Sequence, residues 1–266
     1  MSSQLGLRLH PPLHQRSSFW SIFHAQEFTY TVSNSLLTSP TFHVINPLNH
    51  DAKGDKVSVS LPIKAVSGLG DEEILALLTK GFFGGWVFAI EGWAMRACGG
   101  ILPAAYTGFK ANQTASKRII WKSSDISEDS LVPIGDMLFD FALVSKHIQT
   151  RPDSIPPSSS YGSSYSYSYS YVDYGFGSDQ RNFAGAHRFV VTRKEQDQHQ
   201  HQNQDQDSKE QKEEEYIELS IECFRCNPLI NQDSWAEYLP WLHYWYARFL
   251  WAEAVRTVLR HHPKAT

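Results

Sequence analysis

Cysteine is scarce in this chain, and its three positions, Cys98, Cys223 and Cys226, are too few for the disulfide framework of a secreted domain. The count indicates a reduced intracellular protein, and the cytoplasm is the expected compartment. Cys223 and Cys226 have the spacing of a redox motif, but they fall at the end of a predicted strand, where they would face opposite sides of a sheet. We interpret both as packing residues and expect no metal and no cofactor.

A basic stripe is also missing. The formal net charge is −4, and residues 194–215 alone contribute −5 from three Lys and eight Asp or Glu, which leaves +1 for the rest of the chain. Because a nucleic-acid-binding surface needs clustered cations to contact phosphates, nucleic acid is not expected as a partner.

No apolar run is long enough to predict a membrane span. The longest, residues 81–109, is interrupted by Glu91, Arg96 and Pro103, and a spanning helix would have to bury both charges in hydrocarbon. We therefore expect no integral membrane segment.

Residues 1–26 contain Arg8, Arg16, several Ser and no acid, a composition that permits a mitochondrial transit peptide. Pro11 and Pro12 would interrupt the amphipathic helix of such a peptide. We interpret residues 1–26 as a disordered N-terminal tail, with a mitochondrial location as the alternative.

What the chain does contain is an ordered succession of β-like and helical segments. Residues 57–63 alternate with period two, and residues 71–97 have a helical pattern broken at Gly84-Gly85. Further strand-like runs and a closing helix follow at residues 118–122, 137–144, 187–193, 216–224 and 234–261. This order predicts an α+β fold in which residues 27–266 form one domain, with a curved antiparallel sheet around a long C-terminal helix.

The closing helix has a predicted start and two faces. Ser234 and Glu237 fit a capping box at its N-terminus. One apolar face, predicted to meet the sheet, consists of Leu239, Leu242, Tyr246, Phe249 and Leu250. Glu253, Arg256 and Arg260 fall together on another face.

Two low-complexity insertions are expected within the domain. Residues 151–182 contain a run of alternating Ser and Tyr, and residues 194–215 are rich in Gln, Asp and His. Neither has an apolar face to bury, so both are predicted to be disordered.

One strand, two short helices, an antiparallel sheet and a long final helix resemble the helix-grip fold of the START and polyketide cyclase/dehydratase-like superfamily. The resemblance covers residues 56–261 and depends on order and spacing, with five or six strands recognised here where the family has seven. It implies an apolar tunnel for a lipid, sterol or polyketide-like ligand. The low-complexity insertions are typical of filamentous fungi, and the combination resembles small fungal proteins that accompany secondary-metabolite pathways.

Three polar residues are candidates for acid–base chemistry. Glu91 lies in an otherwise apolar helix, where burial would raise its pKa, and His243 and Tyr246 lie three apart on the last helix. The alternatives are a surface-facing Glu91 and a core histidine with a backbone partner. Asp136 and Asp140 are predicted to point outward and to be solvated.

Aromatic residues and one further histidine are the candidate ligand-binding residues. We expect a cavity mouth or wall to include Phe82, Phe83, Trp86, Trp93, Tyr106, Trp121 and His187. The Gly-rich corner at residues 81–86 lacks the residues of a phosphate-binding loop, and the chain has no serine-hydrolase, zincin or kinase motif.

These features leave three functions open. The first is a cavity-type enzyme, a cyclase, dehydratase or isomerase, acting on a hydrophobic polyketide- or terpene-like intermediate of fungal secondary metabolism. The second is a non-catalytic lipid or sterol carrier, and the third is an interaction protein. In each of the first two the partner is a hydrophobic small molecule. A polar cluster facing the cavity would favour the enzyme, and a wholly apolar tunnel would favour the carrier.

Overall fold

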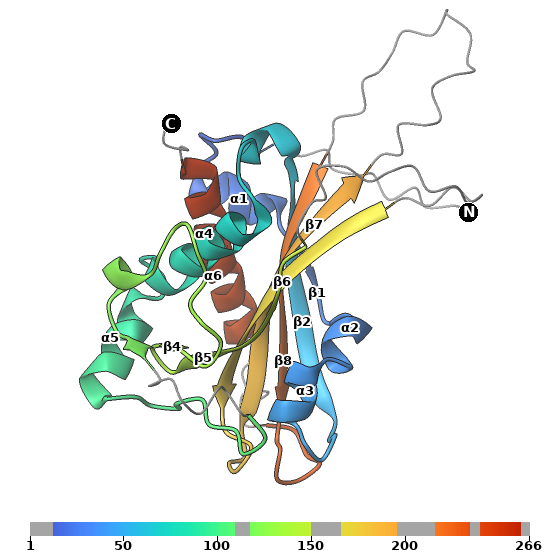
Figure 1. The fold of residues 1–266 in the computed structure, drawn as a ribbon, viewed down its shortest axis with the longest axis vertical. Coiled ribbons are helices and arrows are strands. Elements are labelled where there is room, and N and C mark those ends of the chain that lie inside the picture. Colours follow the sequence, from blue (N-terminus) through green and yellow to red (C-terminus); the bar gives the residue numbers. More distant parts are fainter. Residues whose placement is uncertain (1–12, 110–117, 150–165, 196–215, 235–239, 262–266) are drawn as a thin grey trace, which may run out of the picture.

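The structure is a computed structural model, and it describes residues 13–109, 118–149, 166–195, 216–234 and 240–261. One eight-stranded sheet runs through it in the order β1-β2-β8-β7-β6-β5-β4-β3. The strands are β1 (Glu27–Thr29), β2 (Ala52–Pro62), β3 (Ile119–Ile120), β4 (Met137–Leu138), β5 (Phe141–His147), β6 (Ser166–Gly177), β7 (Ala184–Glu195) and β8 (Tyr216–Cys226). Every neighbouring pair is antiparallel except the short β3–β4 pair. The long strands twist strongly (Figure 1).

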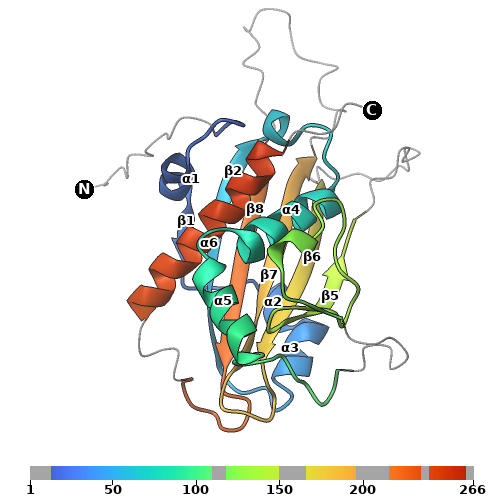
Figure 2. The same ribbon diagram turned by 90° about the vertical axis from the view of Figure 1, so that its left-hand side faces the viewer.

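Helices pack on both faces of this sheet. They are α1 (Phe19–Ala25), α2 (Asn34–Leu37), α3 (Pro40–Ile45), α4 (Asp71–Gly84), α5 (Ala89–Cys98) and α6 (Pro240–Arg260), with short 3-10 turns η1 (Ile63–Val66) and η2 (Ser123–Asp125). The long helix α6 crosses one face, with α4 and α5 in front of it, while α2 and α3 lie behind the sheet (Figure 2). The structure thus has the predicted α+β class and C-terminal helix. Within the described ranges, no single helix is long and apolar enough to cross a membrane.

The main core lies between the sheet and the pair α4–α6. Trp251 of α6 is fully buried, and its ring centroid lies 5.7 Å from that of Phe189 on β7. Gly81 permits the close approach of the two helices, because a Cβ there would lie 2.7 Å from the Cα of Ala254. Trp251 therefore faces the sheet, whereas Ala254 faces α4.

This arrangement corrects the predicted face of the last helix. Leu242 is 49% exposed, and Phe249 is half-buried against α1, with its ring stacked on Phe23 at a centroid distance of 5.0 Å. Glu253 is buried rather than on a solvent face. The predicted capping residue Glu237 and Leu239 lie outside the described residues.

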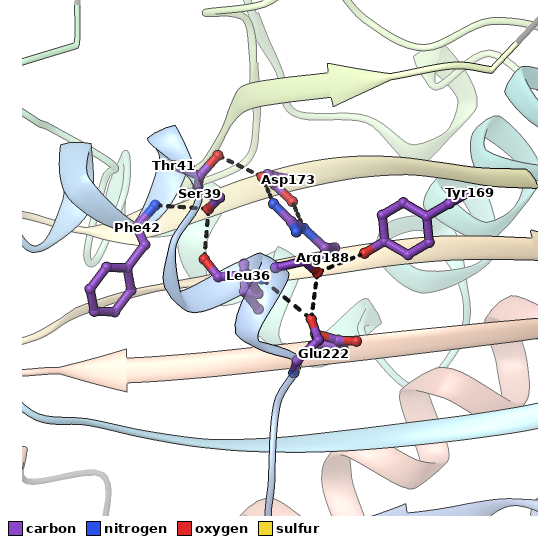
Figure 3. A network of polar contacts seen from close by, with 10 residues as sticks. Leu36, Ser39, Thr41, Phe42, Tyr169, Asp173, Arg188 and Glu222 are labelled. Atoms are coloured by element: carbon purple, nitrogen blue, oxygen red, sulfur yellow. Dashed lines mark hydrogen bonds and ion pairs between the residues drawn. The ribbon is translucent and has the colours of Figure 1, made fainter.

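A second core lies on the outer face, under α2 and α3. It contains Leu36, Phe42 and Ile45, together with an ion pair from the sheet. Arg188 on β7 donates to both carboxylate oxygens of Asp173 on β6, at 2.7 and 2.8 Å, and both side chains are almost completely buried (Figure 3). The hydroxyl of Thr41 on α3 donates to the same carboxylate, so α3 is joined to the centre of the sheet.

The Ser-Tyr run is part of the fold, contrary to the prediction. β6 occupies Ser166–Gly177 and pairs with β5 on one side and β7 on the other, in the middle of the sheet. Its inward residues include the buried Val172 and Tyr174, which continue the alternation beyond the polar run. Residues 178–182 form the turn between β6 and β7, and residues 194–195 end β7, so these parts of the predicted insertions are also ordered. The other parts, within residues 150–165 and 196–215, lie outside the described residues.

Two further predictions need correction. Residues 19–25, assigned to the disordered tail, form α1, which begins at the capping residue Ser18. Residues 137–144 are two strands, because the chain turns at Phe139, whose φ of 54° lies in the left-handed region that bulky residues rarely adopt. The turn rotates Asp140 inward, where it is 2% exposed rather than solvated. The predicted strand at 118–122 shortens to β3.

Candidate functional site

A cavity of about 270 Å3 lies between α5, α6 and the sheet face that they cover. Ten of its lining side chains are apolar: Phe82, Phe88, Met95, Leu102, Phe141, Phe176, Phe183, Ile221, Ala247 and Leu250. The other eight can ionise: Asp55, Glu91, Asp140, His187, Cys223, Arg225, His243 and Tyr246. A small apolar chamber with this many titratable groups is suited to proton transfer.

Glu91 and Tyr246 both line the cavity and are in direct contact. Glu91 comes from the inner side of α5, and the hydroxyl of Tyr246 on α6 donates a hydrogen bond to its Oε2. Burial raises the pKa of Glu91, and the negative charge of Asp140 raises it further, although the hydrogen bond from Tyr246 opposes both effects. A carboxyl group with a raised pKa keeps its proton closer to neutral pH, as a general acid must.

Asp140 is held by the loop that follows α5. The backbone N–H groups of Ile101 and Leu102 donate to its Oδ2 at 2.6 and 2.8 Å. Gly100 is required here, because its φ is 107° and a Cβ would lie 2.9 Å from Oδ1 of Asp140. That Oδ1 is buried and has no hydrogen-bond partner among the described residues. One oxygen therefore fixes the carboxylate, while the other is a buried acceptor without a partner among the described residues.

Asp55, Arg225 and His243 form a charged group on another wall of the cavity. Arg225 on β8 donates to Asp55 on β2 at 2.7 Å, and Nε2 of His243 lies 3.0 Å from Asp55 and 2.8 Å from Nη1 of Arg225. This nitrogen donates to Asp55 only when it carries a proton and accepts from Arg225 only when it does not. Burial alone would raise the pKa of Asp55, but the hydrogen bonds and charges of His243 and Arg225 outweigh burial and lower it.

His187 on β7 is the remaining histidine of the cavity. It lies among aromatic rings, with centroids 4.9 Å from Phe176, 5.5 Å from Phe82 and 5.9 Å from Phe141. Burial lowers its pKa to about 3, and the nearby positive charges of His243 and Arg225 add to this effect. Its Nδ1 is buried without a partner among the described residues, and the low pKa keeps the imidazole neutral in the cavity wall.

The structure brings together only part of the predicted site. Glu91, His243 and Tyr246 all line the cavity, and so do Phe82 and His187. The remaining candidates lie elsewhere.

Three tryptophans and Phe83 do not line this cavity. Trp86 and Trp93 are 61% and 63% exposed, because they lie on the outer side of the α4–α5 corner and of α5. Phe83 is buried behind Phe88, and with Trp93 and Trp121 it lines a separate depression of about 190 Å3. Sequence spacing alone does not distinguish the inner from the outer side of a short helix.

Tyr106 lies on the opposite face of the sheet. It packs in the outer core, and its hydroxyl donates to the carbonyl oxygen of Phe176 at 2.9 Å. It therefore has a structural role behind the cavity wall rather than a contact with the ligand.

Four ionisable residues of the cavity were not predicted to line it: Asp55, Asp140, Cys223 and Arg225. Two of them could have been found from strand periodicity. Asp55 is in phase with the buried Val57 and Val59 of β2, and Arg225 is in phase with Cys223 of β8, so a charge falls on the inward side of each strand. Asp140 gave no such indication, because the turn at Phe139 reverses the side that it faces.

Comparisons with protein-family models, curated proteins and solved structures found no match to this chain. Among the described residues, no group of three or more His, Cys, Asp or Glu side chains is arranged to hold a metal ion.

Proposed function

We propose that this protein is an acid–base enzyme of the cyclase, dehydratase or isomerase type, built on a helix-grip architecture. The architecture is supported by the element order: β2, the helices α4 and α5, the strands β3 to β8 and the long helix α6. With β2 these make seven strands, the number in that superfamily, and β1 is an additional edge strand.

The observation that carries the proposal is the pair Glu91 and Asp140 in an apolar cavity. Their surroundings differ: a phenol donates to Glu91, whereas two backbone N–H groups hold Asp140 and leave Oδ1 unpaired. Two carboxyl groups in unlike surroundings can divide the roles of acid and base. Asp140 is assigned as the base and Glu91, with Tyr246, as the acid.

A dehydration shows how the two carboxyl groups would act. The carboxylate of Asp140 takes a proton from carbon, the C–H electron pair forms the C=C bond, and the C–O bond breaks as Glu91 protonates the departing hydroxyl. Water leaves, and a proton must pass from Asp140 back to Glu91 before the next turnover. An isomerisation or aldol-type cyclisation uses the same two groups to move a proton from carbon and to protonate an oxygen.

Cavity size restricts the substrate. A dry cavity of about 150 Å3 binds benzene, so about 270 Å3 holds a compact molecule of roughly ten to twelve non-hydrogen atoms. A sterol or a long-chain lipid exceeds this space. A one- or two-ring polyketide- or terpene-like intermediate fits it better, and the resemblance to fungal secondary-metabolism proteins points to the same class.

A non-catalytic carrier is the competing function. Eight ionisable residues among eighteen in the lining argue against it. Oδ1 of Asp140 and Nδ1 of His187 are buried without a partner among the described residues, which costs free energy that an apolar wall would avoid. The small number of cysteines supports the cytoplasm as the location of the proposed enzyme.

The test has two stages. Native mass spectrometry of the purified full chain should show a retained small molecule, and its identity defines substrates for a turnover assay. Glu91→Gln and Asp140→Asn should each lower turnover by about 10²–10⁴ while the ligand is still retained. Glu218→Gln, at a surface ion pair with Lys56, is the matched control and should be unchanged. Normal turnover by both cavity variants would refute the assignment, and retention without any turnover would identify a carrier.

A further inference from the structure

The exposed surface around the cavity is unusually aromatic. Five of the eight tryptophans are at least 45% exposed. They lie on α1, at the α4–α5 corner, on α5 and on the first turns of α6, and the exposed Ile90 and Leu242 lie on α5 and α6 with them. We call this surface the aromatic collar; it consists of Trp20, Trp86, Ile90, Trp93, Trp241, Leu242 and Trp245. Exposed apolar surface of this kind marks a binding surface.

Ring contacts join the parts of the collar. Phe19 on α1 lies 5.7 Å from Trp86 and 6.0 Å from Phe249 between ring centroids, and Trp20 lies 6.2 Å from Phe249. The ring of Trp245 on α6 stacks on that of Phe23 on α1, with the centroids 5.7 Å apart. The exposed Trp20, Trp86 and Trp245 therefore share one aromatic base.

Helix α5 presents apolar side chains to solvent on its outer side. Ile90 is 81% exposed and Trp93 63% exposed, and Ala97, one turn further, is also exposed. Its inner side carries Glu91 and Met95 into the cavity. A helix with apolar residues on both sides needs a second apolar environment.

The collar also borders the cavity. Glu91 follows Ile90 on α5, and His243 and Tyr246 follow Leu242 and Trp245 on α6. The side chain of His243 is 26% exposed, so the cavity lining reaches solvent at this edge.

Charge around the collar is positive. Residues 13–26, 85–100 and 240–252, which supply it, contain a single acid, Glu91, and that side chain is bound to Tyr246 inside the cavity. Arg16 and Arg96 are exposed in the same segments. Segments that carry exposed cations and no exposed acid complement an anionic partner.

We propose that the aromatic collar docks on the surface of an anionic lipid bilayer. Tryptophan is the residue that favours the membrane–water interface, and aromatic side chains beside cations are the combination that binds peripheral proteins to anionic lipids. Docking there places the cavity edge at the interface, from which a hydrophobic ligand can enter without crossing water. The proposal holds whether the cavity is catalytic or not.

Vesicle co-sedimentation of the full chain tests this docking. The chain should bind vesicles of phosphatidylcholine with about a quarter phosphatidylserine, bind pure phosphatidylcholine vesicles more weakly, and lose affinity as salt rises. Tryptophan fluorescence should shift to shorter wavelength on binding. The double variant Trp93→Ser/Trp241→Ser should bind at least about tenfold more weakly, because both rings lose apolar burial.

Leu48→Ser is the matched control, since Leu48 is 63% exposed but lies outside the collar, and its binding should equal that of the parent chain. Melting temperatures of all variants should agree, because the substituted side chains are exposed. The proposal is overturned if the parent chain does not bind anionic vesicles, or if the double variant binds as well as the parent. It is also overturned if the parent is a dimer that does not bind vesicles and the double variant is a monomer, since the collar is then a subunit interface.

Discussion

The hydroxyl of Tyr246 on α6 donates a hydrogen bond to Oε2 of Glu91 on α5, and this contact joins the two helices across the cavity. Both groups are largely removed from water. Burial and the neighbouring carboxylate raise the pKa of Tyr246, so the phenol remains a donor. The pKa of Glu91 is also raised, because burial outweighs the stabilising effect of that hydrogen bond on the carboxylate. The pair is therefore poised to hold a proton inside an apolar chamber.

The raised pKa of Glu91 predicts a pH-dependent effect of Glu91→Gln on stability. Since the folded state holds the proton more tightly than the unfolded state, the parent loses stability as pH rises from the unfolded pKa of about 4.5 toward the folded value. The Gln side chain cannot ionise and can still accept the hydrogen bond of Tyr246. Thermal melts followed by circular dichroism should therefore favour the variant increasingly as pH rises above about 4.5, and the difference should level off above the folded pKa of Glu91. An equal deficit of the variant at every pH would contradict this.

Asp140→Asn should lower the pKa of Glu91, because the charge of Asp140 raises it in the parent. The amide oxygen can still accept from Ile101 and Leu102, so the loop should keep its structure. Carbon-13 NMR titration of the Glu91 carboxyl measures the shift directly. Asp136→Asn, in the preceding turn, is the control and should leave that titration unchanged. An unchanged Glu91 titration in Asp140→Asn would mean that the two carboxyl groups do not interact.

Much of the fold was predictable because the long elements have clear periodicity. Alternation defined β2 and β8, and the break at Gly84-Gly85 correctly separated α4 from α5. β6 was missed because its N-terminal half alternates Ser with Tyr, and a strand whose pattern contains no aliphatic residues resembles low-complexity sequence. Its apolar residues, Val172 and Tyr174, come only after that run.

The residues of the candidate site were predicted where a polar side chain interrupts an apolar helix. They were missed where the backbone conformation determines which way the side chain points. Glu91 and Tyr246 were identified in this way, although their direct contact could not be inferred, since it depends on how α5 and α6 cross. Asp140 was assigned to solvent because a regular strand through residues 137–144 would place it there. The positive φ of Phe139 reverses that orientation, and sequence periodicity does not report a strained dihedral angle.

Trp251, rather than Phe249, should carry the main stabilising contact of α6. Trp251→Ala leaves a cavity in the fully buried core and should cost about 3–5 kcal/mol. Phe249→Ala removes a half-buried ring that packs on α1 and should cost less, about 1–3 kcal/mol. Urea denaturation measures both, with the exposed Arg260→Ala expected to be near neutral. A larger loss at Phe249 than at Trp251 would mean that α6 faces the sheet with its other side.

The buried ion pair on the outer face predicts a large effect from removing one partner. Arg188→Met leaves the Asp173 carboxylate buried and without its cation, and should cost about 3–5 kcal/mol. Adding Asp173→Leu should recover part of that loss, because the uncompensated charge is gone. Lys53→Met, at an ion pair whose side chains are 55% and 59% exposed, should change stability by at most about 1 kcal/mol. Similar losses in the two single variants would contradict the burial of the Arg188 pair.

His187→Phe should make the protein less sensitive to acid. The pKa of His187 is about 3 in the folded state and about 6.5 when unfolded, so between these values the unfolded state binds more protons and the parent loses stability as pH falls. A phenylalanine fits the same aromatic surroundings of Phe82, Phe141 and Phe176 and does not titrate. Urea midpoints should therefore fall less in the variant than in the parent from pH 7 to pH 4. His147→Phe, at an exposed position, should keep the pH dependence of the parent. If His187→Phe shows the full acid sensitivity of the parent, the imidazole is protonated in the folded state and cannot serve as a neutral donor or acceptor in the cavity.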